Sequence, residues 1–287
     1  MTVLVALAAL FLQSPSPAPS PSPRVAPSPV GKPSPTVHPV FEPIAPPTAE
    51  AVVTVVQKTK EFAADSGRTA LTADPTRRLP VPGVGDLGYF VEIHWTDKQG
   101  AAHTGLAVVA HDTVQGVPWM VKGEGWGLVK VLEDKTVEGV AGDLAKARMA
   151  ANEASAVGDI RTIYSAEMLF MAVADGSYGD LRCLNIPADC IADIPGEKLL
   201  ERSLTTATEK SGYRRKFHGG TRVTSAKAKG NPSPFVKTFA YTAVPITRGE
   251  TGTRSFCGDS SGKVCVVDDG TEPKVVDGVC TPCAELK

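Results

Sequence analysis

Apolar positions in residues 48–138 change from a helical spacing to a strand spacing. Over 48–67 they recur every three or four residues, after Thr48 as a candidate N-cap and before a glycine at position 67, which predicts a helix. Runs rich in β-branched and aromatic residues follow, separated by the turn signals DKQG and KGEG. The order predicts a small α+β module, a helix followed by an antiparallel meander, whose strands occupy residues 87–97, 103–112, 117–123 and 127–134.

A long helical pattern opens the second region, which we place at residues 139–287. Its apolar and alanine positions are spaced by three and four, and the ADG at 174–176 provides a stop. The methionines in this seam are interpreted as core filling, and no cofactor is predicted. The predicted seam comprises Leu144, Ala147, Ala151, Ala154, Val157, Ile160, Ile163, Tyr164, Met168 and Met171.

Strand signals dominate after this helix. A short helical segment near 196–209 precedes strand-like runs at 239–248, 252–257 and 263–269. The second region is therefore predicted to be a long helix packed on a short antiparallel sheet, and the chain as a whole belongs to the α+β class.

The first 47 residues lack the pattern of a folded unit. Residues 1–13, MTVLVALAALFLQ, have the length of a signal peptide and are short for a membrane-spanning helix. They lack a basic start and a clear Ala-x-Ala cleavage site, so a buried first element stays open as the alternative. Residues 14–47 are rich in proline and serine, which favours an extended, disordered stalk. This organisation predicts an exported protein of the periplasm, cell surface or extracellular space, without a transmembrane helix.

The six cysteines all lie after residue 182. An even, clustered set in an exported chain predicts three disulfides, and close spacing favours local pairing, although other connectivities stay open. Only the CTPC at the end of the chain has the short spacing of metal ligands, and no second CxxC accompanies it, so no metal site is predicted. In local order the cysteines are Cys183 and Cys190, Cys257 and Cys265, and Cys280 and Cys283.

The GDSSG at 258–262 is similar to the surroundings of a chymotrypsin-type serine nucleophile. His103, Asp143 and Ser260 also follow one another in the chymotrypsin order. A long predicted helix holds Asp143, however, whereas those proteases are paired β-barrels. Aspartate, serine and glycine are also the residues that a hairpin loop requires. We therefore interpret the stretch as a turn that places Cys257 opposite Cys265, and we predict no catalytic residues.

A basic stretch, KSGYRRKFHGGTRVTSAKAKG, occupies residues 210–230. Interleaved basic and aromatic residues are typical of surfaces that pair with phosphates and stack on bases. A solvated loop between helix and sheet explains the same residues, and the whole chain carries a formal net charge of only −1. The candidate anion or nucleic-acid contacts are Lys210, Arg214, Arg215, Lys216 and Arg222, with Lys227 and Lys229 farther along.

The aromatic and imidazole groups of the first module suggest two further sites, neither of which we favour. Its tryptophans, at 95, 119 and 126, are interpreted as the core and rim of a small sheet rather than as a ligand groove. Its three histidines lie on adjacent predicted strands, but they lack acidic or cysteine partners at ligand spacing. They are His94, His103 and His111.

Four ordered stretches of the second region read NEASAVGDIRTIYSAEMLF, GSYGDL, SGYRRKF and YTAVPITRGETGTRSFCGDSSGKV. In this order and spacing, over roughly residues 148–268, they resemble the globular half of bacterial type IV pilin-like proteins, relatives of the major pseudopilin of type II secretion. The resemblance implies that NEASAVG lies on the long helix and that GTRSF enters the last β-hairpin.

The chain departs from that family at its N-terminal side. Pilins carry a prepilin-peptidase site before a hydrophobic assembly helix, whereas this chain has the proline-rich stretch and the α+β module there. We therefore expect an exported, non-enzymatic cell-envelope protein with a pilin-like head, whose partners are envelope, secretion or pilus proteins. Nucleic-acid or anion binding through the basic stretch, and serine hydrolysis, stay open as alternatives.

Overall fold

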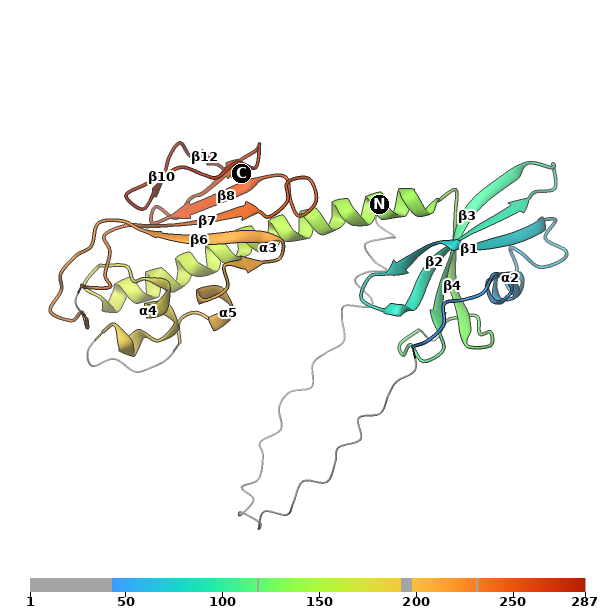
Figure 1. Cartoon of the computed structure of the whole chain (residues 1–287), viewed down its shortest axis with the longest axis horizontal. Helices are drawn as coiled ribbons and strands as arrows, with labels where there is room; N and C mark the ends of the chain where they lie inside the picture. The colour runs from blue at the N-terminus through green and yellow to red at the C-terminus, as the bar shows by residue number, and fades with distance from the viewer. Residues whose placement is uncertain (1–42, 118, 192–197, 231, 287) are drawn as a thin grey trace, which may run out of the picture. The chain divides into compact units, whose positions relative to one another are not determined.

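The computed structural model describes residues 43–286, apart from 118, 192–197 and 231. The predicted signal peptide and most of the predicted stalk, residues 1–42, lie outside the described residues. The chain divides into two compact units after Asp143, five residues beyond the boundary placed from sequence. Figure 1 shows both units, each built from helix and antiparallel sheet, which confirms the α+β class.

The first unit is a four-stranded antiparallel meander in the order β1-β2-β3-β4. The helix α2 (Ala49–Gln57) packs on it, and Thr48 Oγ1 accepts a hydrogen bond from Ala51 N (3.2 Å), as its N-cap position predicts. The apolar face of α2 supplies three buried valines to a core that includes Trp95 and Trp126. The strands are β1 (Thr69–Val81), β2 (Gly85–Thr96), β3 (Ala102–His111) and β4 (Trp126–Glu133).

Three features of this unit differ from the sequence expectation. The helix ends at Gln57 rather than near residue 67. The predicted strand at 117–123 is absent among its described residues, where only Val121 makes an isolated bridge to Leu128. The long edge strand β1 was not predicted, because it is mostly exposed, contains two prolines and pairs with register shifts.

The second unit packs the long helix α3 (Val137–Val173), which begins in the first unit, against a six-stranded antiparallel sheet (Figure 1). The sheet order is β12-β9-β8-β7-β6-β5. Its strands are β5 (Glu209–Lys210), β6 (Tyr213–Gly219), β7 (Phe239–Pro245), β8 (Ser255–Asp259), β9 (Val264–Val267) and β12 (Ala284–Glu285). The remaining elements are α4 (Leu181–Asn185), the 3-10 turn η1 (Pro187–Asp189), α5 (Arg202–Thr205), β10 (Val275–Val276) and β11 (Val279–Cys280).

The core of the second unit lies between α3 and the inner face of the sheet. Ile160, Ile163 and Phe170 of α3 are buried against aromatic residues of β6, β7 and β8. The β7 strand is buried along nearly its whole length, because α3 covers one face and the C-terminal segment covers part of the other. Its run FAYTAVP accordingly lacks the alternation of a half-exposed strand.

The buried face of α3 is only partly the predicted seam. Ile160 and Ile163 are buried as predicted, whereas Ala147, Ala151 and Ala154 are exposed. In their place the helix turns Glu153 and Asp159 inward, where basic groups of β6 and of the loop before β8 reach them. A hydrophobic pattern cannot reveal inward-facing charges, so the N-terminal half of the seam was placed on the wrong face.

Within the described residues, no helix combines the length and the apolar character needed to cross a bilayer.

Candidate interaction surface

Glu153 joins α3 to the loop before β8. One of its carboxylate oxygens accepts from Thr253 N (2.9 Å), Thr253 Oγ1 (2.7 Å) and Arg254 N (3.1 Å). The other accepts from Arg254 Nε (2.9 Å) and Nη2 (2.7 Å). Burial raises the pKa of Glu153, but the hydrogen bonds from Thr253 and Arg254 together outweigh it and hold the pKa below its ordinary value. The neighbouring Asn152 donates to Thr251 O (2.8 Å), so the NEAS stretch and the TGTR stretch form one polar lock.

Asp159 forms a second lock, and it changes the interpretation of the basic stretch. Its carboxylate pairs with Arg215, whose side chain is 1 % exposed, and accepts from Lys210 Nζ (2.9 Å). Arg215 therefore lies inside the molecule, on the face of β6 that packs toward α3, and the predicted phosphate contact at this residue is wrong. Lys210 likewise has an internal partner. Side chains of a strand alternate between its two faces, so a strand at residues 213–219 would place Arg215 on the opposite face from Arg214 and Lys216. The interpretation of these residues as a loop misses this signal.

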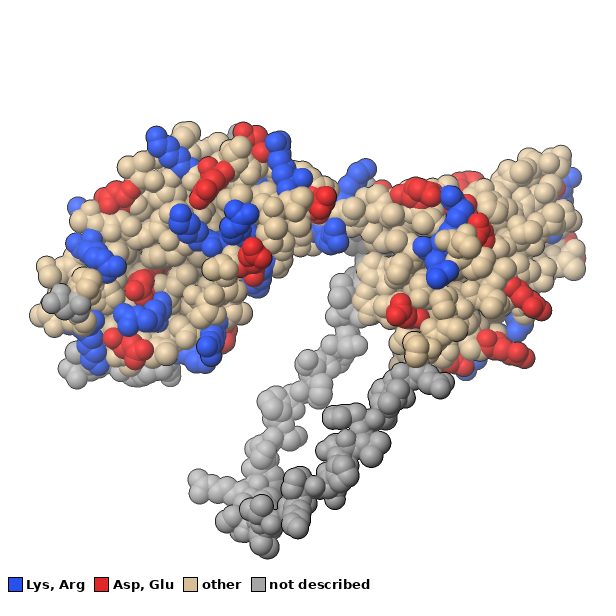
Figure 2. Space-filling view, viewed as in Figure 1, with Lys and Arg blue, Asp and Glu red and all other residues tan. Residues whose placement is uncertain are grey.

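The other members of the basic stretch do not share one surface role. Arg214 and Lys216 are exposed on the opposite face of β6. Arg222 donates to Ser233 O (2.5 Å), and Lys227 pairs with Asp175 (2.6 Å). On the side seen in Figure 2, lysines and arginines of the second unit alternate with acidic side chains instead of forming a single basic patch. This arrangement does not favour a phosphate-tracking groove.

The GDSSG sequence is a hairpin turn between β8 and β9. Asp259 Oδ1 accepts from Ser261 N (2.9 Å) and Ser261 Oγ (2.6 Å), and Oδ2 accepts from Cys280 N (2.9 Å). Gly262 has a φ of +82°, which glycine adopts without strain, and its N–H donates to Asp259 O (3.0 Å). Ser260 N donates to Phe239 O (3.0 Å). Asp259 and Ser261 thus stabilise the turn, and Asp259 and Ser260 also tie it to Cys280 and Phe239.

The imidazole suggested for a hydrolase has local partners of its own, and the suggested carboxylate is exposed. His103 belongs to the first unit, where Nε2 lies 2.9 Å from Asp97 Oδ2 and the ring stacks on Trp95. Asp143 is exposed on α3. His94 and His111 contact threonine hydroxyls, at 3.1 Å and 2.9 Å. Each of these histidines therefore contacts a separate neighbour rather than a shared centre.

Two of the three disulfides differ from the predicted local pairing. Cys183 pairs with Cys190 as predicted. Cys257 and Cys265 do face each other across β8 and β9, but each is bonded to the C-terminal segment, Cys257 to Cys280 and Cys265 to Cys283. Residues opposite one another in a sheet point to the same face, and β11 passes over that face. Both cysteines of the sheet therefore meet the segment that covers them, and the bridges close longer loops than local pairing would.

The opposite side of the sheet leaves a groove between α3 and β8. It has a volume of about 370 Å³ and lies beside the polar lock of Glu153 and Arg254. Phe256 and Leu286 line it from the sheet side. The helix side is lined by Ala150, Ala154, Val157, Gly158 and Arg161.

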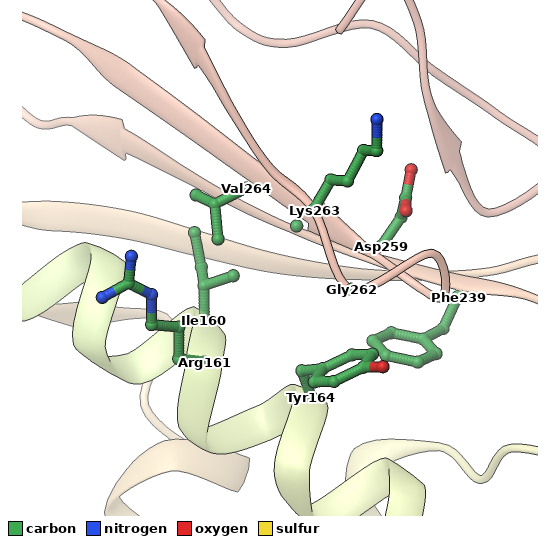
Figure 3. A pocket seen from close by; sticks show the side chains of 9 residues that line it. Ile160, Arg161, Tyr164, Phe239, Asp259, Gly262, Lys263 and Val264 are labelled. Atoms are coloured by element: carbon green, nitrogen blue, oxygen red, sulfur yellow. The ribbon is translucent and has the colours of Figure 1, made fainter. Parts of the chain in front are cut away.

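Arg161 also borders a smaller cavity of about 20 Å³ under the β8–β9 hairpin. Figure 3 shows that Tyr164 lies beside Phe239 beneath the turn, and that Lys263 points away from the helix. The close approach depends on glycine, because a Cβ atom on Gly258 would collide with Ile160 and one on Gly262 would lie 2.9 Å from Tyr164 Oη. Arg161 therefore borders both the groove and the cavity under the hairpin.

The charges of α3 are segregated between its two faces in the second unit. Between Leu144 and Val173 all three acidic residues are buried, namely Glu153, Asp159 and Glu167. All three basic residues are exposed, namely Lys146, Arg148 and Arg161. Between Leu144 and Val173 the outward face of this helix therefore carries only positive charge, among uncharged side chains, whereas the exposed Asp143 precedes this stretch.

Glu167 is the most deeply buried of these acids, with 0 % exposure. One oxygen accepts from Gly179 N (3.0 Å), and the other has no hydrogen-bond partner among the described residues. Burial raises the pKa of Glu167 to about 8; the Gly179 hydrogen bond opposes this effect, and the charge of Asp180 adds to it. Asp180 also lies close to Cys183 and Cys190, but their disulfide leaves no thiolate to hold a metal ion.

The groove and Arg161 were not predicted from sequence. A signal was present in the spacing: Glu153, Asp159 and Glu167 fall on the same helical face as Ile160 and Ile163. Lys146, Ala150, Ala154 and Arg161 share another face, on which Asp143 also lies. The tryptophan interpretation holds for Trp95 and Trp126, which are buried, while Trp119 is 57 % exposed.

Comparison of the chain with protein-family models, with curated proteins and with solved structures finds no match.

Proposed function

We propose that the chain is an exported, non-enzymatic protein of the cell envelope that binds other proteins through its second unit. The observation that carries the binding role is the outward face of α3 between Leu144 and Val173, which combines uncharged side chains, exclusively positive charge and an adjoining groove. Solvated helices usually carry both signs of charge, and a smooth face with one sign suits a complementary partner.

The cysteines support the exported location. All six are in disulfides, which is compatible with an extracellular or periplasmic protein. Two of these bonds hold the C-terminal segment over one face of the sheet, so reduction would release a cover from the second unit.

The resemblance to pilin-like proteins refines the proposal to an accessory of a secretion or pilus system. The motifs that carry the resemblance are physically coupled in this chain, since Asn152 and Glu153 of NEAS bond the residues of TGTR. This coupling gives a structural reason for both motifs to occur together. This coupling supports an accessory role in a secretion or pilus system, and it does not require the hydrophobic assembly helix of pilins.

Chemical crosslinking in cells tests the proposal. The full chain should form discrete adducts with envelope proteins, recovered in the envelope fraction. A matched chain lacking residues 1–13 serves as the control and should lose these adducts, because it should remain in the cytosol. Recovery of the full chain only in cytosolic complexes would contradict the proposal.

A further inference from the structure

We infer that the groove between α3 and β8 binds an acidic segment of a partner protein, with a carboxylate beside an aliphatic side chain. The inference rests on the proposed function and names the surface and the partner chemistry that would perform it. It follows from the shape of the groove, the state of its charges and the face of the helix that continues from it.

The walls of the groove fit an aliphatic side chain. The half-buried Leu286 forms one side, and Val157 with Ala154 forms the other; Phe256 borders the groove with 0 % exposure. Its volume of about 370 Å³ exceeds that of a single side chain, so a short segment of chain can enter. Alanine and glycine on the helix allow a partner backbone to approach α3 closely, which favours a peptide over a bulky ring system.

The charges around the groove leave an excess of one cation. The carboxylate of Glu153 accepts five hydrogen bonds from Thr253 and Arg254. Arg254 gives Nε and Nη2 to that carboxylate and makes no other side-chain hydrogen bond among the described residues. Arg161 has no carboxylate within 4.0 Å among the described residues. No carboxylate of the described residues thus occupies the guanidinium of Arg161, whose planar fork matches an incoming carboxylate bidentately.

The same face of α3 extends this positive site. Lys146, Ala150, Ala154 and Arg161 are spaced by four, four and seven residues, so they lie along one face of the helix. The distance from Lys146 to Arg161 along the helix axis is about 22 Å, which an extended segment of about seven residues spans. A partner with acidic residues at both ends of such a segment would complement both cations.

Binding of a short probe peptide tests the inference. The probe is a fluorescein-labelled peptide that alternates glutamate and leucine, and its counterpart has glutamine in place of each glutamate. Fluorescence anisotropy with the full-length chain should show that the glutamate peptide binds at least about tenfold more tightly, since a charge-assisted hydrogen bond is worth about 1.5 kcal/mol or more.

Three variants locate the site. Arg161→Gln should weaken binding of the glutamate peptide by about tenfold, and Ala154→Leu should abolish it by filling the groove from an exposed helical position. Arg214→Gln is the matched control, because it removes an arginine that is also exposed, on the other face of the sheet, and it should change the affinity by less than about twofold. Far-UV circular dichroism verifies that each variant is folded.

Several results would overturn the inference. One is equal binding of the glutamate and glutamine peptides, and another is equal weakening by Arg161→Gln and Arg214→Gln, which would indicate general attraction to basic charge. Sedimentation that reveals self-association of the chain, broken by Ala154→Leu, would assign the groove to a second copy. Envelope adducts that persist in Arg161→Gln would refute the groove as the binding site but leave the proposed function standing. Peptide binding without any envelope adduct would refute the proposed function but leave the groove as a peptide-binding site.

Discussion

Replacing Glu167 by glutamine should change how the stability of the second unit depends on pH. The carboxyl group of Glu167 is fully buried and accepts a single hydrogen bond, from Gly179 N. Burial raises its pKa from an ordinary 4.5 to about 8, although the Gly179 hydrogen bond opposes the change, and the nearby Asp180 raises it further. The pKa of Tyr178, which also faces this carboxyl, is raised too, first by its own burial.

The sign and size of the effect follow from proton linkage. Between pH 4.5 and about pH 8 the folded unit holds a proton on Glu167 that the unfolded chain has lost. The free energy of unfolding should therefore be highest below pH 4.5 and fall by up to about 1.4 kcal/mol for each pH unit until the folded group ionises. Glutamine does not titrate, so at pH 7 the variant should gain up to about 3 kcal/mol, less any cost of its unpartnered amide.

The chain contains its own probes for this measurement. All three tryptophans belong to the first unit, whereas four of the five tyrosines belong to the second. Urea unfolding at several pH values, followed by near-UV circular dichroism of tyrosine and by tryptophan fluorescence, separates the two units. Glu250→Gln, at an exposed position of the second unit, is the matched control. If the tyrosine transitions of wild type and Glu167→Gln keep the same pH dependence from pH 5 to 8, the assignment of a buried proton is wrong.

Three further predictions concern the second unit. Glu153→Gln should lower the free energy of unfolding by about 2 kcal/mol at pH 7. Because the pKa of Glu153 is lowered in the folded state, the stability that its carboxylate contributes is present above the ordinary pKa and is lost in acid. The urea unfolding curves of variant and wild type should therefore converge at acidic pH. Replacing both Cys257 and Cys280 by alanine should lower the free energy of unfolding by about 3 kcal/mol, because the disulfide between them is lost. An unchanged thermal midpoint of unfolding would contradict a stabilising role for this disulfide. Gly258→Ala should lower the free energy of unfolding by about 1–3 kcal/mol, because the added methyl group overpacks against Ile160. In a double-mutant cycle, adding Ile160→Ala should recover part of that loss. Strictly additive changes in unfolding free energy would show that the two side chains do not touch.

The sequence predicts much of the fold where apolar patterning and turn chemistry agree. The N-cap at Thr48, the central strands of the first sheet, the long helix and the hairpin around Gly262 follow from local signals. Each of these elements is specified by the residues it contains. The edge strand β1 and the strand β6 are not, because one is exposed and the other carries charges on both faces.

The site could be predicted less well, because it depends on which distant groups meet. Glu153 and Asp159 lie inside only because Arg254 and Arg215 reach them from the sheet, about a hundred and about fifty residues away. The same long-range geometry decides the disulfides: sequence proximity favours Cys257 with Cys265, whereas the covering segment brings Cys280 and Cys283 to them. A single sequence shows the charges but not their partners.

Mapping of the disulfides in protein taken directly from cells tests the account at its foundation. Thiols are blocked at lysis, and peptides are identified by mass spectrometry before and after reduction. The account predicts three linked pairs, Cys183 with Cys190, Cys257 with Cys280, and Cys265 with Cys283. Six blocked thiols would contradict an oxidising location. A Cys257–Cys265 disulfide would contradict the covering of the sheet by the C-terminal segment, and with it the assignment of binding to the α3 side.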